Sequence, residues 1–177
     1  MTNAVTFERK TTPQLDTAVR SLSTLRKPVH DNDDGTESRT LLADIQQAVR
    51  TVQARGLCRV ASADASLAFQ PRVLLSLLVY CYLTDTFSSI DIEEMMRADE
   101  TFRNLCRHEL PPARVIRHFR RDNRNTIREC IFIVLCRQCQ RYSPPGEPSA
   151  RRLDALMEEA DGRILKAMFI DHMEEEA

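Results

Sequence analysis

The stretch that decides the fold of this chain runs from Phe69 to Asn123 and reads FQPRVLLSLLVYCYLTDTFSSIDIEEMMRADETFRNLCRHELPPARVIRHFRRDN. It opens with a proline-led apolar segment, passes a Ser88–Ser89 turn and two short helical patterns, and closes on the basic run RHFRR. Pro71 suits the first position of a helix, because its missing N–H would be unpaired there. The segment after it is apolar almost all round, which is typical of a helix at the centre of a domain. The stretch therefore predicts a compact helical unit that ends in an arginine-rich helix.

The length and composition of the chain limit the class of protein to which it can belong. At 177 residues, with 42% hydrophobic and 29% charged residues, the chain has the size and composition of a globular domain. Four glycines and no tryptophan leave little room for a phosphate-binding loop or a turn-rich β-barrel. No apolar run approaches the roughly 20 residues that span a bilayer, and the N-terminus lacks the apolar region of a signal peptide. We therefore expect a soluble, cytoplasmic protein.

Turn-forming residues divide the chain into segments, and no strand pattern survives inspection. Apolar spacing predicts helices over about 13–25, 42–52, 71–83, 112–123, 125–142 and 153–168, the last followed by an acidic tail. Two short helices are expected between the third and fourth of these, one starting after Ser88 and one after Asp99. Loops are expected at 31–35, at 57–68 and at the proline-rich linker 143–148. The fold class is all-α, a compact multi-helix domain with a central apolar helix and a helix-turn-helix-like segment. We divide it into an N-terminal helix and acidic loop (1–36), a helical domain (37–142) and a linker with an acidic C-terminal helix (143–177).

Local signals place the helix ends. Ser88 is a good N-cap, with Asp91 three residues on in a variant of the capping box. Asp99 can cap the next short helix, and Leu110 with the two prolines after it makes a firm break. Gly56 stops the helix before the central one.

Charge is segregated along the chain, although the net charge is only −1. Between Arg97 and Arg141 there are eleven arginines against five acidic residues. From Glu147 to the end there are nine acidic residues against four basic ones. Such segregation can create a basic patch that the total charge hides.

The helix predicted at 112–123 carries the candidate chemistry. Val115, Ile116 and Phe119 group on one edge at 3.6 residues per turn. Basic residues occupy the remaining circumference, with Arg120 at the border of the apolar edge. A short helix of this kind, entered after a proline turn, suits the second helix of a helix-turn-helix, whose arginines contact phosphates or guanine edges. A solvated surface helix is the alternative. The candidate DNA-binding residues are Arg114, Arg117, His118, Arg120, Arg121 and Arg124.

The cysteines are Cys58, Cys81, Cys106, Cys130, Cys136 and Cys139. They lie in or near apolar helical patterns and do not resemble a disulfide framework. The last three have a spacing that zinc could use, with Cys106 or His108 as a fourth ligand. The run IFIVL between them has the pattern of a buried helix without turn residues, which favours buried free thiols over a metal site. We therefore expect no metal, although these cysteines leave a zinc site open.

Residues 69 to about 123 resemble the N-terminal helical domain of bacterial insertion-sequence transposases of the DDE class. In that family a proline-led apolar helix is followed by a Ser-Ser turn, an acidic helix, a Phe-Arg-x-Leu-like segment, a Leu-x-Pro break and a helix ending Arg-Phe-Arg-Arg. The matching residues are Pro71, Leu74, Leu75, Leu78, Tyr80, Tyr82, Leu83, Thr84, Ser88, Ser89, Glu93, Asp99, Phe102, Leu105, Leu110, Pro111, Phe119, Arg120 and Arg121.

The chain also departs from that family. The glycine usual before the Ser-Ser turn is Asp85 here, and the arginine usual after the turn is Ile90. The acidic residue usual after the Leu-x-Pro break is missing, because a second proline, Pro112, stands there. In that family the catalytic domain is an RNase H-like α/β fold whose carboxylates bind two metal ions. We expect no such domain in the residues after Tyr142. The resemblance thus implies DNA binding without strand transfer.

Two functions remain open. The chain is a stand-alone module derived from a mobile-element transposase, domesticated or left as a remnant, that binds double-stranded DNA. Alternatively, it is a helical interaction or homodimerisation module without DNA binding, in which the helix at 125–142, apolar on two sides, seals a dimer. An exposed basic surface would favour the first, and an acidic helix folded over the arginines would favour the second, or autoinhibition. We expect no enzyme, no cofactor, no membrane and no small-molecule substrate.

Overall fold

The computed structural model describes residues 35–56, 69–106, 110–142 and 150–176. These residues form α-helices and no strand, so the predicted all-α fold class is confirmed. In chain order the helices are α2 (Gly35–Ala54), α3 (Pro71–Leu83), α4 (Ser89–Ala98), α5 (Glu100–Leu105), α6 (Ala113–Asp122), α7 (Arg124–Arg141) and α8 (Ala150–Glu176). The expected N-terminal helix, the loops before Gly35 and at 57–68, and the linker at 143–148 lie outside the described residues. None of the described helices has the length and hydropathy needed to cross a membrane.

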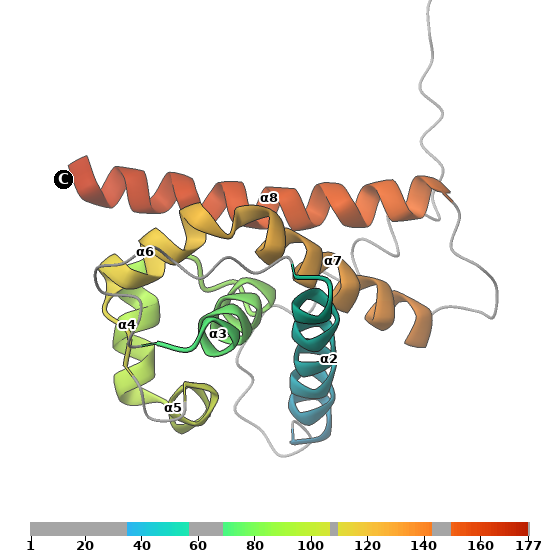
Figure 1. The fold of residues 1–177 in the computed structure, drawn as a ribbon, viewed down its shortest axis with the longest axis horizontal. Coiled ribbons are helices and arrows are strands. Elements are labelled where there is room, and N and C mark those ends of the chain that lie inside the picture. The colour runs from blue at the N-terminus through green and yellow to red at the C-terminus, as the bar shows by residue number, and fades with distance from the viewer. Residues whose placement is uncertain (1–34, 57–68, 107–109, 143–149, 177) are drawn as a thin grey trace, which may run out of the picture.

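Helix α3 is the centre of the fold, as its all-round apolar sequence predicts. Nine of its thirteen residues are buried, because α2, α5, α7 and α8 all pack around it. Figure 1 shows α3 nearly end-on, with α2 on one side, α4 and α5 on the other, and α6 to α8 above. Pro71 begins the helix as predicted. The Gln70 carbonyl accepts the N–H groups of Val73 and Leu74 at 2.8 and 3.2 Å.

The end of α3 explains one departure from the transposase pattern. Asp85 has a φ of 61°, in the left-handed region that favours glycine. The N–H of Thr86 reaches back to the Cys81 carbonyl at 2.8 Å, which is the longer hydrogen bond of a Schellman-type helix end. This turn requires a positive φ, so the glycine usual at this position has a conformational reason. Aspartate is one of the few other residues that tolerate this conformation.

Helix α7 lies between α2 and α8 in Figure 1, and it packs extensively against both. Buried residues such as Ile127, Val134 and Leu135 fill the two sides. No large apolar side chain of α7 is among the exposed ones. The two apolar sides that suggested a dimer helix thus pack largely within the chain, while Phe132, Ile133 and Cys136 of α7 are only partly buried. The homodimer through α7 stays a prediction.

Helix α4 begins where the sequence predicts, and α6 begins within one residue of its predicted start. The Ser88 hydroxyl accepts hydrogen bonds from the N–H groups of Ile90 and Asp91 at 3.1 and 3.2 Å, so the predicted N-cap of α4 is confirmed. The proline break ends where expected, and α6 is one residue shorter at each end than predicted.

Helix α8 differs from the prediction in two respects. It continues through the expected acidic tail to Glu176. It also begins at Ala150, three residues before the predicted start. Leu156 and Ile164 are buried, whereas the Leu165 side chain is 50% exposed. The packed face of α8 instead continues through Ala167 to a buried carboxylate, Asp171.

Candidate nucleic-acid interface

Helix α6, which carries the candidate residues, is fixed at its start by a side chain from α4. Pro112 provides no side-chain cap. The Ala113 N–H instead donates to Glu93 Oε2 at 2.7 Å. A carboxylate at this end satisfies an unpaired N–H and interacts favourably with the helix dipole. Glu93, also paired with Arg97, supplies a negative charge where this chain has Pro112 in place of the usual acidic residue.

One edge of α6 anchors it to the core. Val115, Ile116 and Phe119 are at most 4% exposed, as their spacing predicts. The remaining circumference carries the arginines and His118. The apolar edge thus holds the helix in place, so that its other side chains have defined positions.

The six candidate residues fall into three groups according to how exposed their side chains are. Arg114, His118, Arg121 and Arg124 are exposed, and Arg117 is partly buried. Arg120, predicted at the border of the apolar edge, is only 1% exposed. In this conformation Arg120 has no surface to offer to DNA, whereas the other five residues do.

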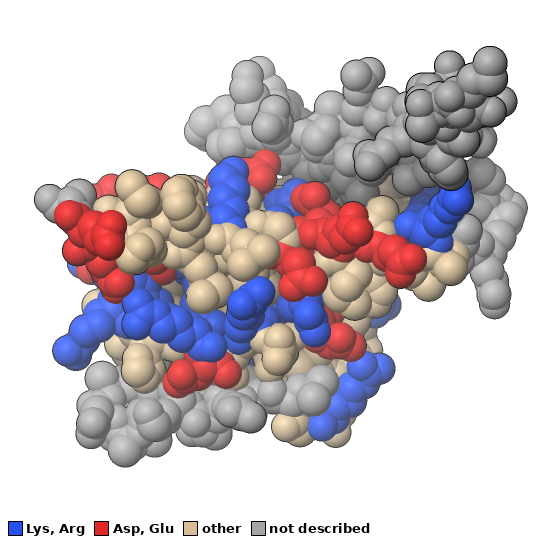
Figure 2. All heavy atoms as spheres, turned by 90° about the horizontal axis from the view of Figure 1, so that it is seen from above, with Lys and Arg blue, Asp and Glu red and all other residues tan. Residues whose placement is uncertain are grey.

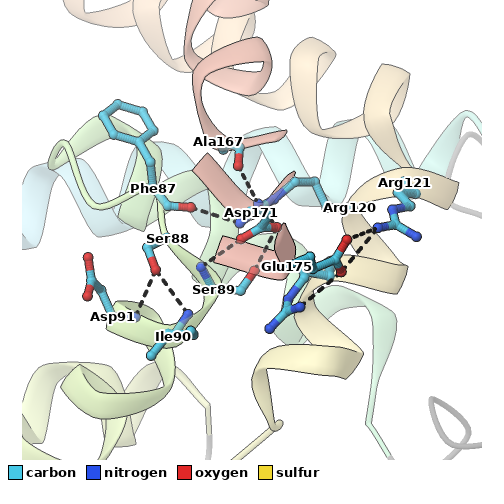
Figure 3. Close-up of polar contacts among 11 residues, drawn as sticks. Phe87, Ser88, Ser89, Ile90, Asp91, Arg120, Arg121, Ala167, Asp171 and Glu175 are labelled. Atoms are coloured by element: carbon cyan, nitrogen blue, oxygen red, sulfur yellow. Dashed lines mark hydrogen bonds and ion pairs between the residues drawn. The ribbon is translucent and has the colours of Figure 1, made fainter. Parts of the chain in front are cut away.

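Arg120 instead holds three elements together, as Figure 3 shows. One terminal nitrogen of its guanidinium donates to Asp171 of α8 and to the Ala167 carbonyl, the latter at 3.0 Å. The other donates to the Phe87 carbonyl at 3.0 Å. The Asp171 carboxylate also accepts the N–H and the hydroxyl of Ser89, both at 3.0 Å. This buried cluster joins the start of α4, the end of α6 and the last part of α8.

The last turn of α8 also pairs with the exposed side of α6. Glu175 accepts from Arg117 at 2.9 Å and forms an ion pair with Arg121 at 3.1 Å (Figure 3). Hydrogen bonding from Arg117, with the nearby charge of Arg121, holds the pKa of Glu175 below its usual range. Because this pKa is lowered, the contact stabilises the fold above the ordinary carboxylate pKa and is lost as the pH falls through the lowered value.

Two exposed arginines lack such partners among the described residues. Arg114 and Arg124 form no ion pair with any residue that the structure describes. His118 lies 3.7 Å from Asp122, too far for a hydrogen bond. Arg114, His118 and Arg121 share one side of α6, since they are spaced by four and three residues.

Elsewhere in the basic segment, much of the arginine excess is neutralised. Arg137 and Arg141 both pair with the buried Asp44 of α2, at 3.2 and 2.9 Å. Arg128 lies 3.5 Å from Asp161 of α8. Figure 2, seen from above, shows basic atoms in a row beside α8 with acidic atoms on both sides of the row. The basic patch expected from charge segregation is therefore narrow and is limited largely to α6 and the start of α7.

The cysteines considered for zinc lie within helix α7. Cys130 and Cys139 are buried, Cys136 is partly buried, and burial raises the pKa of Cys136 to about 11. Among the described residues, which exclude His108, no group of three or more potential ligands gathers. Cys106 is buried with its sulfur 3.3 Å from that of Met96.

The sequence reasoning missed Asp171 and Glu175 as partners of the arginines. A signal for Asp171 was present, because it continues the series Leu156, Ala160, Ile164 and Ala167 at helical spacing. A carboxylate on the core face of a helix is rarely fully buried unless it is paired. Its partner comes from 51 positions away, which spacing along one helix does not reveal.

Fold and site together define an all-helical domain whose arginine-bearing helix follows a proline break and lies under an acidic helix. The sequence model of the transposase domain family (DUF772) matches residues 33–122, about half of the chain, and the chain belongs to this family. The match extends from α2 to the end of α6, so α7 and α8 follow it. No curated protein and no solved structure gives a match. The expected relationship to transposases is thus confirmed.

Proposed function

We propose that the chain is a transposase-derived module that binds double-stranded DNA through the exposed side of α6. The observation that carries the proposal is the presence of two exposed arginines without an ion pair to any described residue, Arg114 near the start of the core-anchored α6 and Arg124 at the first residue of α7. Arg121, 59% exposed, lies between them and is held only at the surface by Glu175.

The dimensions of this edge fit a duplex. Arg114 and Arg121 are seven positions apart on α6, which is about 10 Å at the rise of an α-helix. Arg124 follows at the first residue of α7. The major groove is about 12 Å wide, so guanidinium groups at the two ends can reach phosphates on both sides while the middle of the helix faces the bases. Arg117 and His118 would then contribute from the same edge.

The proposal also covers the family relationship of the module and its lack of catalytic activity. Its order of motifs supports a relationship to the N-terminal domain of DDE transposases, and we propose that it has no strand-transfer activity of its own. After Tyr142 the described residues form α8, and the buried carboxylate on this helix, Asp171, is held by Arg120 and Ser89. A carboxylate occupied in this way is a poor candidate for a catalytic metal ligand.

Binding to random and insertion-end duplexes across a salt series tests the proposal. We expect the Arg114→Ala/Arg121→Ala/Arg124→Ala variant to bind more weakly and to reduce the slope of log K against log salt by up to about three, since each phosphate contact contributes about one. Arg120 is left intact because the fold depends on it. A control with the same change in charge, Arg39→Ala/Arg50→Ala/Arg72→Ala, removes exposed arginines of α2 and α3 and should keep the slope. Equal losses in both variants would contradict contact through α6.

A second candidate function is a helical interaction module without DNA binding. The observation in its favour is Glu175, which already occupies Arg117 and Arg121 from the acidic end of α8. No binding at low salt, with every variant folded, would reject the DNA proposal and leave this function as the better account.

If DNA is bound, Glu175 competes with phosphate for the same guanidinium groups. We expect Glu175→Gln to tighten DNA binding about two- to tenfold at low salt, because exposed ion pairs are individually weak. Affinity is measured beside Glu158→Gln, an equal charge change at an exposed position of α8. The same increase in both variants would indicate a general effect of charge, and no increase in either would show that α8 does not compete.

A further inference from the structure

Three large apolar side chains lie exposed in a line on α8. Leu165, Phe169 and Met173 are 50%, 63% and 51% exposed, and they are spaced by four residues. Residues four apart are neighbours on a helix surface, so the three form one continuous apolar line about two turns long.

This apolar line lies on the side of α8 opposite the core. At 100° per residue, its mean direction is about 180° from that of the packed face formed by Leu156, Ala160, Ile164, Ala167 and Asp171. In Figure 1 all other described helices lie on one side of α8. Figure 2, which looks onto α8, shows uncharged atoms over much of its left part, where the C-terminal half lies. A surface helix normally carries polar residues on this side.

Gly162 gives a second, independent observation on the same side. It precedes Leu165 by three residues and lies in the interior of α8, where glycine is unfavourable because it loses much backbone entropy. A Cβ atom built on Gly162 would meet nothing within 4 Å. Packing within the chain therefore does not account for the glycine, whereas a backbone approaching from outside would.

The charges at the two ends of this side are opposite. Arg151 begins the outward side of α8 and Glu176 ends it, both exposed. When two copies of α8 run antiparallel with Phe169 of one over Gly162 of the other, each Arg151 lies within about one helical turn of Glu176 in the other copy. A parallel pair would instead place like charges together. The surface is therefore complementary to itself, as a twofold interface requires.

We propose that the outward side of α8 is a self-association surface, on which a second copy of this chain packs its own α8 in antiparallel orientation. Phe169 fills the space that Gly162 leaves open, and Leu165 and Met173 pack on either side of it. The arginine side of α6 is not part of this contact. The inference thus stands independently of DNA binding.

Sedimentation of the full chain over a range of concentrations tests this surface. We expect the wild type to form a concentration-dependent dimer, and Phe169→Glu to remain a monomer with unchanged helix content. The matched control is Ile90→Glu, which places the same charge at a 41% exposed apolar position on α4 and should still dimerise. A wild type that stays monomeric throughout, or a Phe169→Glu variant that dimerises as well as the wild type, would overturn the proposal.

A charge exchange tests the orientation. We expect Arg151→Glu alone and Glu176→Arg alone to weaken dimerisation several-fold, and the double variant to restore it. A double variant as weak as the single ones would rule out the antiparallel pairing. These positions are exposed in the monomer, so the three variants should fold alike.

Discussion

Replacing Arg120 with methionine is expected to lower the free energy of unfolding by about 3–5 kcal/mol, because it leaves a buried charge without its partner. The guanidinium is 1% exposed and donates to Asp171, Ala167 and Phe87. Its loss leaves two buried carbonyl groups without that donor and the Asp171 carboxylate with only the Ser89 contacts. Urea denaturation, followed by circular dichroism, measures the change.

A neighbouring arginine provides the control for this prediction. Arg121→Met removes the same functional group one residue away, where the side chain is 59% exposed, and should cost less than about 1 kcal/mol. The double change Arg120→Met/Asp171→Leu should be less damaging than Arg120→Met alone, because it removes both buried charges. Equal costs for Arg120→Met and Arg121→Met would contradict the structural role of Arg120.

The same arginine shows how far sequence reasoning reaches in this chain. The apolar edge of α6 could be predicted from the spacing of Val115, Ile116 and Phe119, since periodicity on one helix is a local property. The burial of Arg120 could not be predicted in this way, because it depends on a second helix about fifty positions further along the chain. A residue at the border of an apolar edge becomes buried when another element covers that border.

Helix α8 shows that composition alone can also mislead a prediction. Its acidic end has the composition of a solvated tail, and contacts with the arginines of α6 and with Ser89 of α4 give that end a reason to remain helical and packed. The central α3, in contrast, was predictable because a helix that is apolar all round has only one favourable place in a domain. The N-cap at Ser88 was predictable because a cap and its helix are neighbours in sequence.

Truncating Leu78 to alanine is expected to lower the free energy of unfolding by about 2–5 kcal/mol, the usual range for a buried leucine. Leu78 is fully buried near the middle of α3, which packs against four other helices, so the surrounding side chains cannot easily collapse into the space left behind. Denaturant unfolding should show a lower midpoint with an unchanged slope, because the surface exposed on unfolding stays nearly the same.

The matched variant is Leu165→Ala, the same truncation at a 50% exposed position on the outward side of α8. In dilute solution it should cost less than about 0.5 kcal/mol, as surface substitutions usually do. At high protein concentration its cost should rise, because a dimer that forms through this side stabilises the folded state by mass action. The cost of Leu78→Ala should remain nearly constant over the same range. A Leu165→Ala cost that is large even in dilute solution would mean that Leu165 supports the fold of the single chain, whereas dependence on concentration would identify its contribution as intermolecular.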